Sequence, residues 1–229
     1  MSKLENLVSR ILKAHARLIT DKEINLQHQL QIQATKESIE FINKNMPDVM
    51  IYENRIGIRN FYLNNITADG LFLEFGVFEG DSINLIAKKF QNKTIHGFDS
   101  FEGLPEDWGG SFYDKEYFNL KGNLPKVEKN VVLHKGWFED TIPEFLKSNK
   151  ENIAFLHIDC DLYSSTKTVF DLVGDKIQKD TIIQFDEFLN TVNWKKHEYK
   201  AFSEFVEENN VKFDYLAVDG DGRVCVRIK

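Results

Sequence analysis

The sequence is poor in several features that define whole classes of protein. It has two cysteines, Cys160 and Cys225, which lie far apart and in no C-x-x-C arrangement, so we predict buried thiols rather than a disulfide or a zinc site. No uninterrupted apolar run approaches the ~20 residues that a membrane-spanning helix needs. The first ten residues, MSKLENLVSR, carry charges where a signal peptide would be apolar. We therefore expect a cytoplasmic protein without a membrane partner.

Positive charge is also scarce. The chain has 29 Lys and Arg against 36 Asp and Glu, which gives a formal net charge of -7. Nucleic acids and anionic membranes attract clustered Lys and Arg, so the balance argues against both as partners. With 229 residues the chain can form one large domain with extensions. We place a helical N-terminal extension at residues 1–65 and the main domain at 66–229.

Short apolar runs recur along the main domain, with helical patterns between them. This alternation is typical of parallel strands joined by crossover helices, and hence of an α/β, Rossmann-like sheet. We predict seven strands, near residues 71–75, 94–98, 131–134, 153–158, 181–185, 213–218 and 223–228. The turn Asp219–Gly222 joins the last two and is a hairpin signal, so the final strand should run antiparallel.

Helical spacing of apolar residues dominates the segment before the sheet. It predicts amphipathic helices over 3–19 and much of 22–45, and a short one at 57–65. The first two would pack over the main domain or against a second subunit, which makes a homo-oligomer possible. A capping-box pattern at 141–144 predicts the start of a helix, and 198–209 should form the last one.

Residues 101–127 interrupt the alternation. They contain two prolines, four glycines and several aromatic residues without a sustained period. A loop of this length is usually a lid or a binding element, although an Ω-loop packed by its own aromatic residues is the alternative. The residues of this loop that could stack on a ligand ring or exclude water from a site are Trp108, Phe112, Tyr113 and Tyr117.

The stretch Leu71–Gly80 is typical of a strand, a tight glycine turn and a helix start. Its pattern Glu-x-Gly-x-x-x-Gly, formed by Glu74, Gly76 and Gly80, differs from the dinucleotide fingerprint G-x-G-x-x-G. An acidic residue before the first glycine would repel a pyrophosphate but suits a cation such as S-adenosylmethionine. Asp99 ends the next strand, where a carboxylate can accept both ribose hydroxyls or cap a helix.

Five motifs, in this order and spacing, resemble those of the macrocin O-methyltransferase family, the sugar methyltransferases of macrolide biosynthesis. They are LEFGVFEGDSI, GFDSFEGLPEDW, KGWFEDTIP, HIDCDLYSST and FDEF, within residues 70–215. The resemblance implies a class I methyltransferase fold and transfer of a methyl group from S-adenosylmethionine to a hydroxyl. It also implies a divalent metal, typically magnesium.

The resemblance also implies a cofactor site. The glycine turn would shape the methionine pocket, Asp99 and Ser100 would bind the ribose, and Gly136 and Trp137 would lie at the adenine, although Trp137 could instead belong to the core. The full expected set is Glu74, Phe75, Gly76, Gly80, Ser82, Asp99, Ser100, Gly136, Trp137 and Asp159.

The metal ligands that the resemblance implies are Asp159, Asp186 and Glu187. The family usually has two aspartates at the last pair, so Glu187 is a departure that keeps a carboxylate. Hard oxygen ligands suit Mg²⁺, which acidifies and orients a hydroxyl bound to it. Asp159 could instead cap the helix that follows, and Asp161 is expected to cap that helix or to support the ligands.

Methyl transfer to an alcohol also needs a base. Family members have a histidine in the lid, but residues 97–133 contain none here. We take His197 as the substitute, with Asp159 as the other catalytic residue. His134 and His157 are alternatives, but histidines within strands are more often core residues.

Two other functions fit part of the sequence. Asp159-Cys160-Asp161 is a D-x-D motif, which in a metal-dependent glycosyltransferase would hold a nucleotide diphosphate. A methyltransferase-like domain could also bind a ligand without turnover, and the missing lid histidine is compatible with that alternative.

Overall fold

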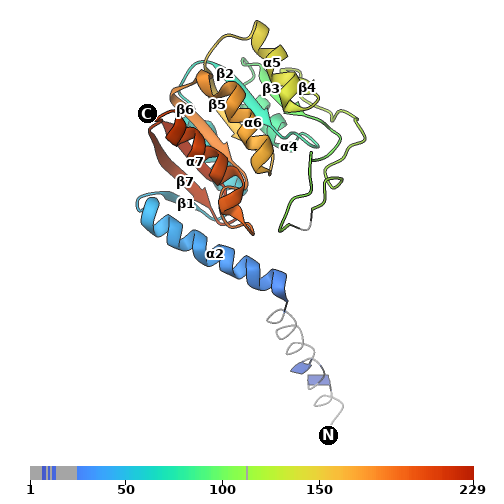
Figure 1. The fold of residues 1–229 in the computed structure, drawn as a ribbon, viewed down its shortest axis with the longest axis vertical. Coiled ribbons are helices and arrows are strands. Elements are labelled where there is room, and N and C mark those ends of the chain that lie inside the picture. The colour runs from blue at the N-terminus through green and yellow to red at the C-terminus, as the bar shows by residue number, and fades with distance from the viewer. Residues whose placement is uncertain (1–6, 9, 11, 14–24, 112) are drawn as a thin grey trace.

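The computed structural model describes residues 7, 8, 10, 12, 13, 25–111 and 113–229. The helix predicted over 3–19, the start of the one predicted from 22, and Phe112 therefore lie largely or wholly outside the described residues. Helix α2 (Leu26–Asn45) begins after Asn25, whose side chain accepts a hydrogen bond from the His28 backbone N–H. Figure 1 shows α2 at one end of the domain, beside β1 and β7. Among the described helices, none combines the length and apolarity needed to cross a bilayer.

One eight-stranded sheet forms the centre of the molecule, in the order β1-β7-β8-β6-β5-β2-β3-β4. Strand β8 is antiparallel to β6 and β7, and the other neighbouring pairs are parallel. The bounds are β1 Met50–Tyr52, β2 Leu71–Phe75, β3 Ile95–Asp99, β4 Val131–Lys135, β5 Ile153–Ile158, β6 Ile177–Phe185, β7 Phe213–Asp219 and β8 Val224–Ile228. The predicted mostly parallel sheet with an antiparallel last strand is confirmed.

The predicted number of strands, seven, is wrong. The sheet has an additional strand, β1, which was not predicted. It pairs in parallel with β7 at the edge of the sheet, with Met50 opposite Ala217. Two of its three residues, Met50 and Ile51, are exposed. A strand so short and so exposed has no alternation of apolar and polar residues, which is why the sequence pattern did not predict it.

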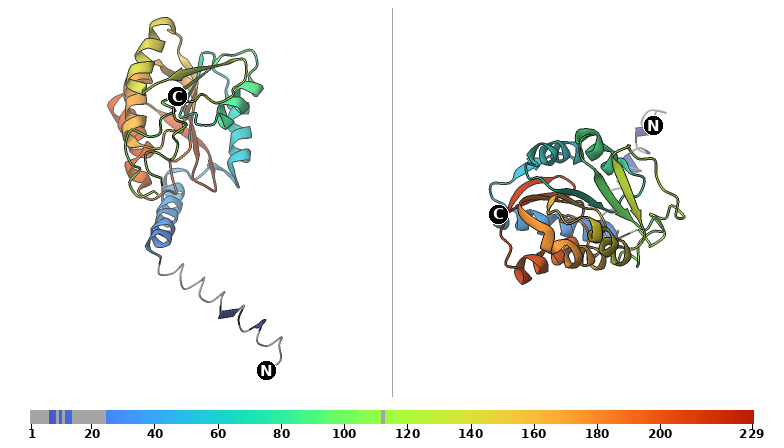
Figure 2. Two further views of the ribbon diagram at one scale, coloured as in Figure 1. Left: turned by 90° about the vertical axis from the view of Figure 1, so that its right-hand side faces the viewer. Right: turned by 90° about the horizontal axis from the view of Figure 1, so that it is seen from above.

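Helices cover both faces of the sheet, as the right-hand view of Figure 2 shows. Helices α3 (Arg55–Asn65) and α4 (Asp81–Lys89) contribute Ile58, Tyr62, Ile83 and Ile86 to one buried cluster. The other cluster contains residues of α5 (Phe138–Ser148), α6 (Tyr163–Val173) and α7 (Glu198–Glu208). Two short 3₁₀ helices, η1 (Gly174–Lys176) and η2 (Trp194–Lys196), precede β6 and α7.

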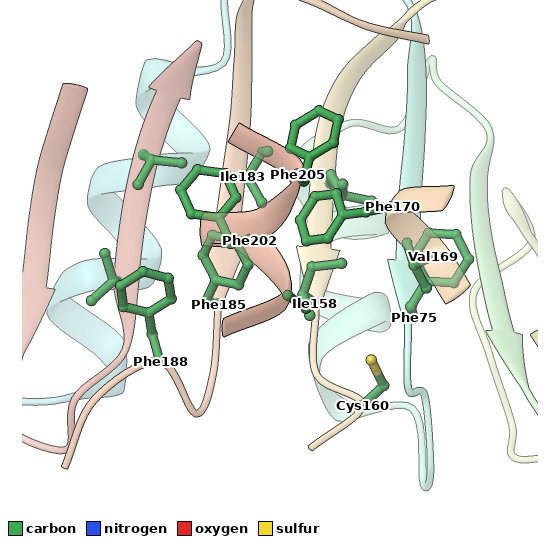
Figure 3. Packing of buried hydrophobic residues seen from close by; sticks show 14 of the residues in the cluster. Phe75, Ile158, Cys160, Val169, Phe170, Ile183, Phe185, Phe188, Phe202 and Phe205 are labelled. Carbon is green, nitrogen blue, oxygen red and sulfur yellow. The ribbon is translucent and has the colours of Figure 1, made fainter. Parts of the chain in front are cut away.

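Aromatic packing fixes α6 and α7 on the sheet. The rings of Phe170 and Phe205 are stacked, with centroids 4.8 Å apart, and Phe185 of β6 lies 5.0 Å from Phe202 (Figure 3). Buried aromatic side chains remove large apolar areas from water. This packing therefore holds the ends of β5 and β6 in place, and the candidate site lies at those ends.

The predicted capping box does not start a helix. Helix α5 begins at Phe138, and Thr141 lies inside it, where its hydroxyl donates to the Trp137 carbonyl at 2.9 Å. Glu139 and Asp140 occupy the first turn, where carboxylates interact favourably with the helix dipole. The prediction failed because a threonine inside a helix can bond back to a carbonyl four residues earlier, which gives the same residue types without a cap.

Candidate active site

The ends of the central parallel strands open into a cavity of about 610 Å³. A cavity of this size suits a small-molecule ligand. Of the predicted site residues, those that line it are Gly76, Asp99, Ser100, Gly136, Trp137, Asp159, Asp186 and Glu187. Those that do not line it are Glu74, Phe75, Gly80, Ser82 and His197.

The glycine turn brings the end of β2 against the end of β5. Gly76 has φ +90°, and a Cβ there would lie 1.7 Å from the Asp159 carbonyl oxygen, so no other residue fits. The backbone N–H of Asp159 donates to the Phe75 carbonyl at 2.9 Å. The turn therefore places its own backbone beside Asp159.

Glu74 lies beneath this turn and is fully buried. One carboxylate oxygen accepts from the Ser82 hydroxyl at 2.8 Å, and the other is 2.9 Å from Nδ1 of His157. Glu74 therefore joins β2 to α4 and β5. Its negative charge is compensated inside the protein.

His157 is a charged core residue and not a group at the cavity surface. Burial by itself lowers the pKa of His157, but the neighbouring carboxylates of Asp186 and Glu74 raise it well above its ordinary value. Its Nε2 lies 3.6 Å from Oδ1 of Asp186. The imidazolium thus links two buried carboxylates.

Asp186 is surrounded by cations. Its Oδ2 accepts from Arg223 Nε at 3.0 Å and from Arg55 Nη2 at 3.1 Å, while His157 faces Oδ1. Burial alone raises the pKa of Asp186, but the His157 hydrogen bond and the charges of His157, Arg223 and Arg55 lower it well below its ordinary value. The ionised form of Asp186 is therefore stabilised.

Three neighbouring carboxyl groups have the opposite environment. Within the described part of the chain, the side chains of Asp159, Asp161 and Glu187 form no salt bridge, although His157 lies within 4.8 Å of Asp159, and the oxygens of the three carboxyl groups lie within 4.8 Å of one another. Burial and the charge of Asp186 raise the pKa of Asp159 to about 7. Burial and neighbouring carboxylates also raise the pKa values of Asp161 and Glu187. A cation between these groups would relieve their repulsion.

The donor set fits a hard divalent cation. His157, Asp159 and Asp186 form a second group within 4.8 Å, so Asp159 is common to both groups. The predicted ligand Asp186 belongs to the group with His157, and the predicted ligand Glu187 belongs to the group with Asp161. Buried carboxylates that are close enough to share one ion are the ligands that Mg²⁺ prefers. Asp159, Asp161 and Glu187 therefore fit the metal that the resemblance implies, whereas the carboxylate of Asp186 is already paired with Arg55, Arg223 and His157.

Asp161 does not cap the following helix. Strand β5 ends at Ile158, Asp161 has φ +63°, and the N-cap of α6 is Leu162 without a side-chain hydrogen bond. The left-handed turn at Asp161 brings its carboxylate next to Asp159. Neither the turn nor this proximity could be read from the D-x-D spacing.

Asp99 holds the loops at the other end of the cavity. Its Oδ2 accepts from the N–H groups of Val77 and Phe78, both at 2.8 Å, and Oδ1 accepts from Phe101 N–H at 2.7 Å. A carboxylate has about four acceptor sites, so these bonds leave about one for a ligand hydroxyl. Gly136 donates its N–H to the Asp99 carbonyl at 3.0 Å, which brings the turn after β4 to the same place.

The lid contributes aromatic side chains to the cavity. Trp108, which is 7% exposed, lines it together with Tyr113 and Phe118, whereas Tyr117 is exposed. The His197 ring packs edge-on against Trp108, with centroids 6.2 Å apart. Burial lowers the pKa of His197, so it is neutral at pH 7. His197 thus lies behind Trp108 and not at the cavity surface.

Two structural observations concern residues that the sequence did not identify. Arg55 lines the cavity although it precedes the first predicted strand by sixteen positions. Glu198 is fully buried, and its Oε2 accepts from the Glu187 N–H at 3.0 Å, while Oε1 has no partner. No motif marks either residue. Asn54 before Arg55 is a helix N-cap signal, which predicts only the start of α3.

Known proteins resemble this chain in sequence and in fold. Residues 73–188 match the family model described as a methyltransferase domain. The solved structure of CalS11, a calicheamicin methyltransferase, has a TM-score of 0.61 and 20% identity, over 86% of this chain and 91% of that one. The O-methyltransferase NovP has a TM-score of 0.57 and 20% identity, over 76% of this chain and 78% of its own. No curated protein matches the sequence.

Proposed function

Because the chain belongs to the methyltransferase-domain family, we propose that it is an S-adenosylmethionine-dependent O-methyltransferase acting on a hydroxyl of a sugar or sugar-containing small molecule. The observation that carries the proposal is the glycine turn at Gly76, packed directly against Asp159 at the wall of the cavity. A methyl donor at the turn and an alcohol at the carboxylates would be adjacent. The five motifs favour the macrocin-like branch of the family.

The donor would lie over the ends of β2, β3 and β4. Gly76 gives a ligand close access to backbone, and Asp99 retains about one acceptor site for a ribose hydroxyl. Trp137 lines the cavity beyond Asp99 and offers a flat apolar surface for adenine. Glu74 and Ser82 do not line the cavity, and their role would be to hold the turn in its conformation.

The acceptor hydroxyl would lie at Asp159. When bound there, a divalent cation would lower the pKa of the hydroxyl and fix its direction. The residues that would hold the cation are Asp159, Asp161 and Glu187, whose oxygens lie within 4.8 Å of one another. Asp186, the third predicted ligand, lies within 4.8 Å of Asp159 but is paired with Arg55 and Arg223. Trp108 and Tyr113 of the lid would exclude water and contact the acceptor ring.

Ligand binding tests the function without knowledge of the acceptor. We expect calorimetry to detect binding of S-adenosylhomocysteine but not of UDP, because the glycine turn lacks a cation for a pyrophosphate. Binding of UDP alone would favour the glycosyltransferase alternative.

Turnover is the second test. A panel of hydroxylated sugars should yield a methylated product that EDTA suppresses. If S-adenosylhomocysteine binds but no member of a broad panel is methylated, a domain that binds without turnover becomes the better description.

A further inference from the structure

Arg55 is the one basic residue among the described residues that line the cavity. The other charged lining residues are Asp99, Glu139, Asp159, Asp161, Asp186 and Glu187. Arg55 is the first residue of α3, and the Asn54 side chain fixes this helix start by accepting from the N–H groups of Ile56 and Gly57. The Arg55 side chain is nevertheless 51% exposed.

The need to neutralise the charge of Asp186 does not explain why Arg55 lies at the cavity. Arg223, whose side chain is 10% exposed, already donates to the same carboxylate oxygen at 3.0 Å, and His157 faces the other oxygen. A half-exposed ion pair adds little to stability. Within the described residues, Arg55 makes one side-chain hydrogen bond, through Nη2, so most of its five N–H donors stay available.

The position of Arg55 separates it from the methyl donor. The proposed donor site lies over β2, β3 and β4, whereas the carboxylates lie at the ends of β5 and β6. Arg55 contacts Asp186 at the end of β6 and belongs to α3, which follows edge strand β1 on the far side of β6. With the donor at that place, a ligand group that reaches Arg55 belongs to the acceptor.

We propose that Arg55 binds an oxyanion of the acceptor, so that the substrate is a sugar carrying a phosphate or a carboxylate rather than a neutral sugar. The inference rests on the proposed function and names its substrate class. A guanidinium forms charge-assisted, often bidentate hydrogen bonds to either group. Among the described residues that line the cavity, Arg55 alone carries a positive charge for such an anion, and this contact would fix the orientation of the sugar.

Calorimetry on protein saturated with S-adenosylhomocysteine and MgCl₂ tests this inference. The probes are glucose 1-phosphate, glucuronate and neutral methyl glucoside, so the two anions distinguish a phosphate from a carboxylate. At least one anion should bind about tenfold or more tightly than the glycoside, as expected for hydrogen bonds to a charged group. Arg55→Gln should abolish this preference, and Arg55→Lys should retain part of it.

Lys229→Gln is the matched control. Lys229 is 53% exposed and pairs with one carboxylate, that of Asp214. It follows Ile228, which pairs with Phe213, the first residue of β7, at the strand ends opposite the cavity. This variant should keep the preference for the anion. An equal Kd for the glycoside, a preserved preference in Arg55→Gln, or failure of both anions to bind the wild-type protein would overturn the inference.

The proposed function is checked separately, before any sugar is added. Arg55→Gln should bind S-adenosylhomocysteine within about twofold of the wild type, because the inference places Arg55 at the acceptor and not at the donor. If the wild-type protein does not bind S-adenosylhomocysteine, the proposed function fails, whatever the sugars do.

Discussion

Asp159 and Asp186 end neighbouring strands and face one cavity, yet their surroundings are opposite. Asp186 has Arg55, Arg223 and His157 around it, and its pKa is lowered. Asp159 has other carboxyl groups around it, and its pKa is raised to about 7. Two aspartates at equivalent strand ends can therefore have opposite pKa shifts. The partners of each carboxylate decide whether it stabilises the protein or is available to a ligand.

Removing the uncompensated carboxylate should have the largest effect. Asp159→Asn takes away the one ligand common to both groups, so we expect kcat to fall by about a thousandfold or more. Steady-state kinetics against an active acceptor measures it. Binding of S-adenosylhomocysteine should change by less than about threefold. Asp175→Asn, at an exposed carboxylate of η1, is the control, and unchanged turnover in Asp159→Asn would eliminate the metal mechanism.

Substitution of the arginines paired with Asp186 should change the free energy of unfolding more than it changes ligand binding. Arg223→Met removes the buried cation that Asp186 and Asp219 share, and breaking such a pair costs about 3–5 kcal/mol. Arg55→Met removes a half-exposed partner from the same oxygen and should cost less than about 1 kcal/mol. Urea unfolding of both variants measures these losses in the free energy of unfolding. Equal losses would show that burial does not distinguish the two arginines.

The two carboxylates should also give opposite pH dependences. Since the pKa of Asp159 rises from 3.8 to about 7 on folding, the folded state holds the proton more tightly. The metal-free protein should lose stability as the pH rises from about 4 to about 7, by up to about 1.4 kcal/mol per pH unit for this group. The pKa of Asp186 is lowered, so its contribution is present above pH ~4 and is lost on acidification.

Thermal unfolding from pH 4 to pH 8, with and without MgCl₂, measures both trends. Mg²⁺ should raise Tm more at pH 8 than at pH 5, because protons compete with the cation for Asp159. The Asp159→Asn variant should flatten the metal-free decline. A Tm gain from Mg²⁺ that does not depend on pH would contradict this assignment.

His197 should show the smallest effect. Its ring packs against Trp108. We therefore expect His197→Ala to lower kcat/KM by about fivefold without a change in pH profile. Loss of a catalytic base would lower the rate by a factor of about 100 or more. His28→Ala, on the exposed side of α2, is the control. A larger loss together with loss of the basic limb of the profile would instead support the proposed role of His197 as base.

Much of the fold was predictable from the sequence. Strands 71–75 and 153–158 were placed at their observed bounds, because buried parallel strands form continuous apolar runs. Asp159 and Asp186 directly follow the predicted strands 153–158 and 181–185, and both lie at the observed strand ends. The exposed strand at 50–52 and the start of α5 at Phe138 were not predicted, since neither depends on a periodic pattern.

The candidate site was less predictable. His157 was an ordinary strand histidine until the structure placed Glu74 and Asp186 on its two ring nitrogens. Asp161 required a left-handed turn, and Arg55 required the edge strand that directs α3 toward β6. Each of these contacts joins residues that are far apart in the sequence or on different faces of a turn.

The sequence by itself determined the sheet, the glycine turn and the presence of acidic residues at the strand ends, because backbone periodicity and the steric freedom of glycine are local properties. Only the tertiary structure decided which of those acids are neutralised. The charge state of a carboxylate depends on its burial and on the cations within a few ångströms, and Arg55, Arg223 and His157 reach Asp186 from three separate segments of the chain.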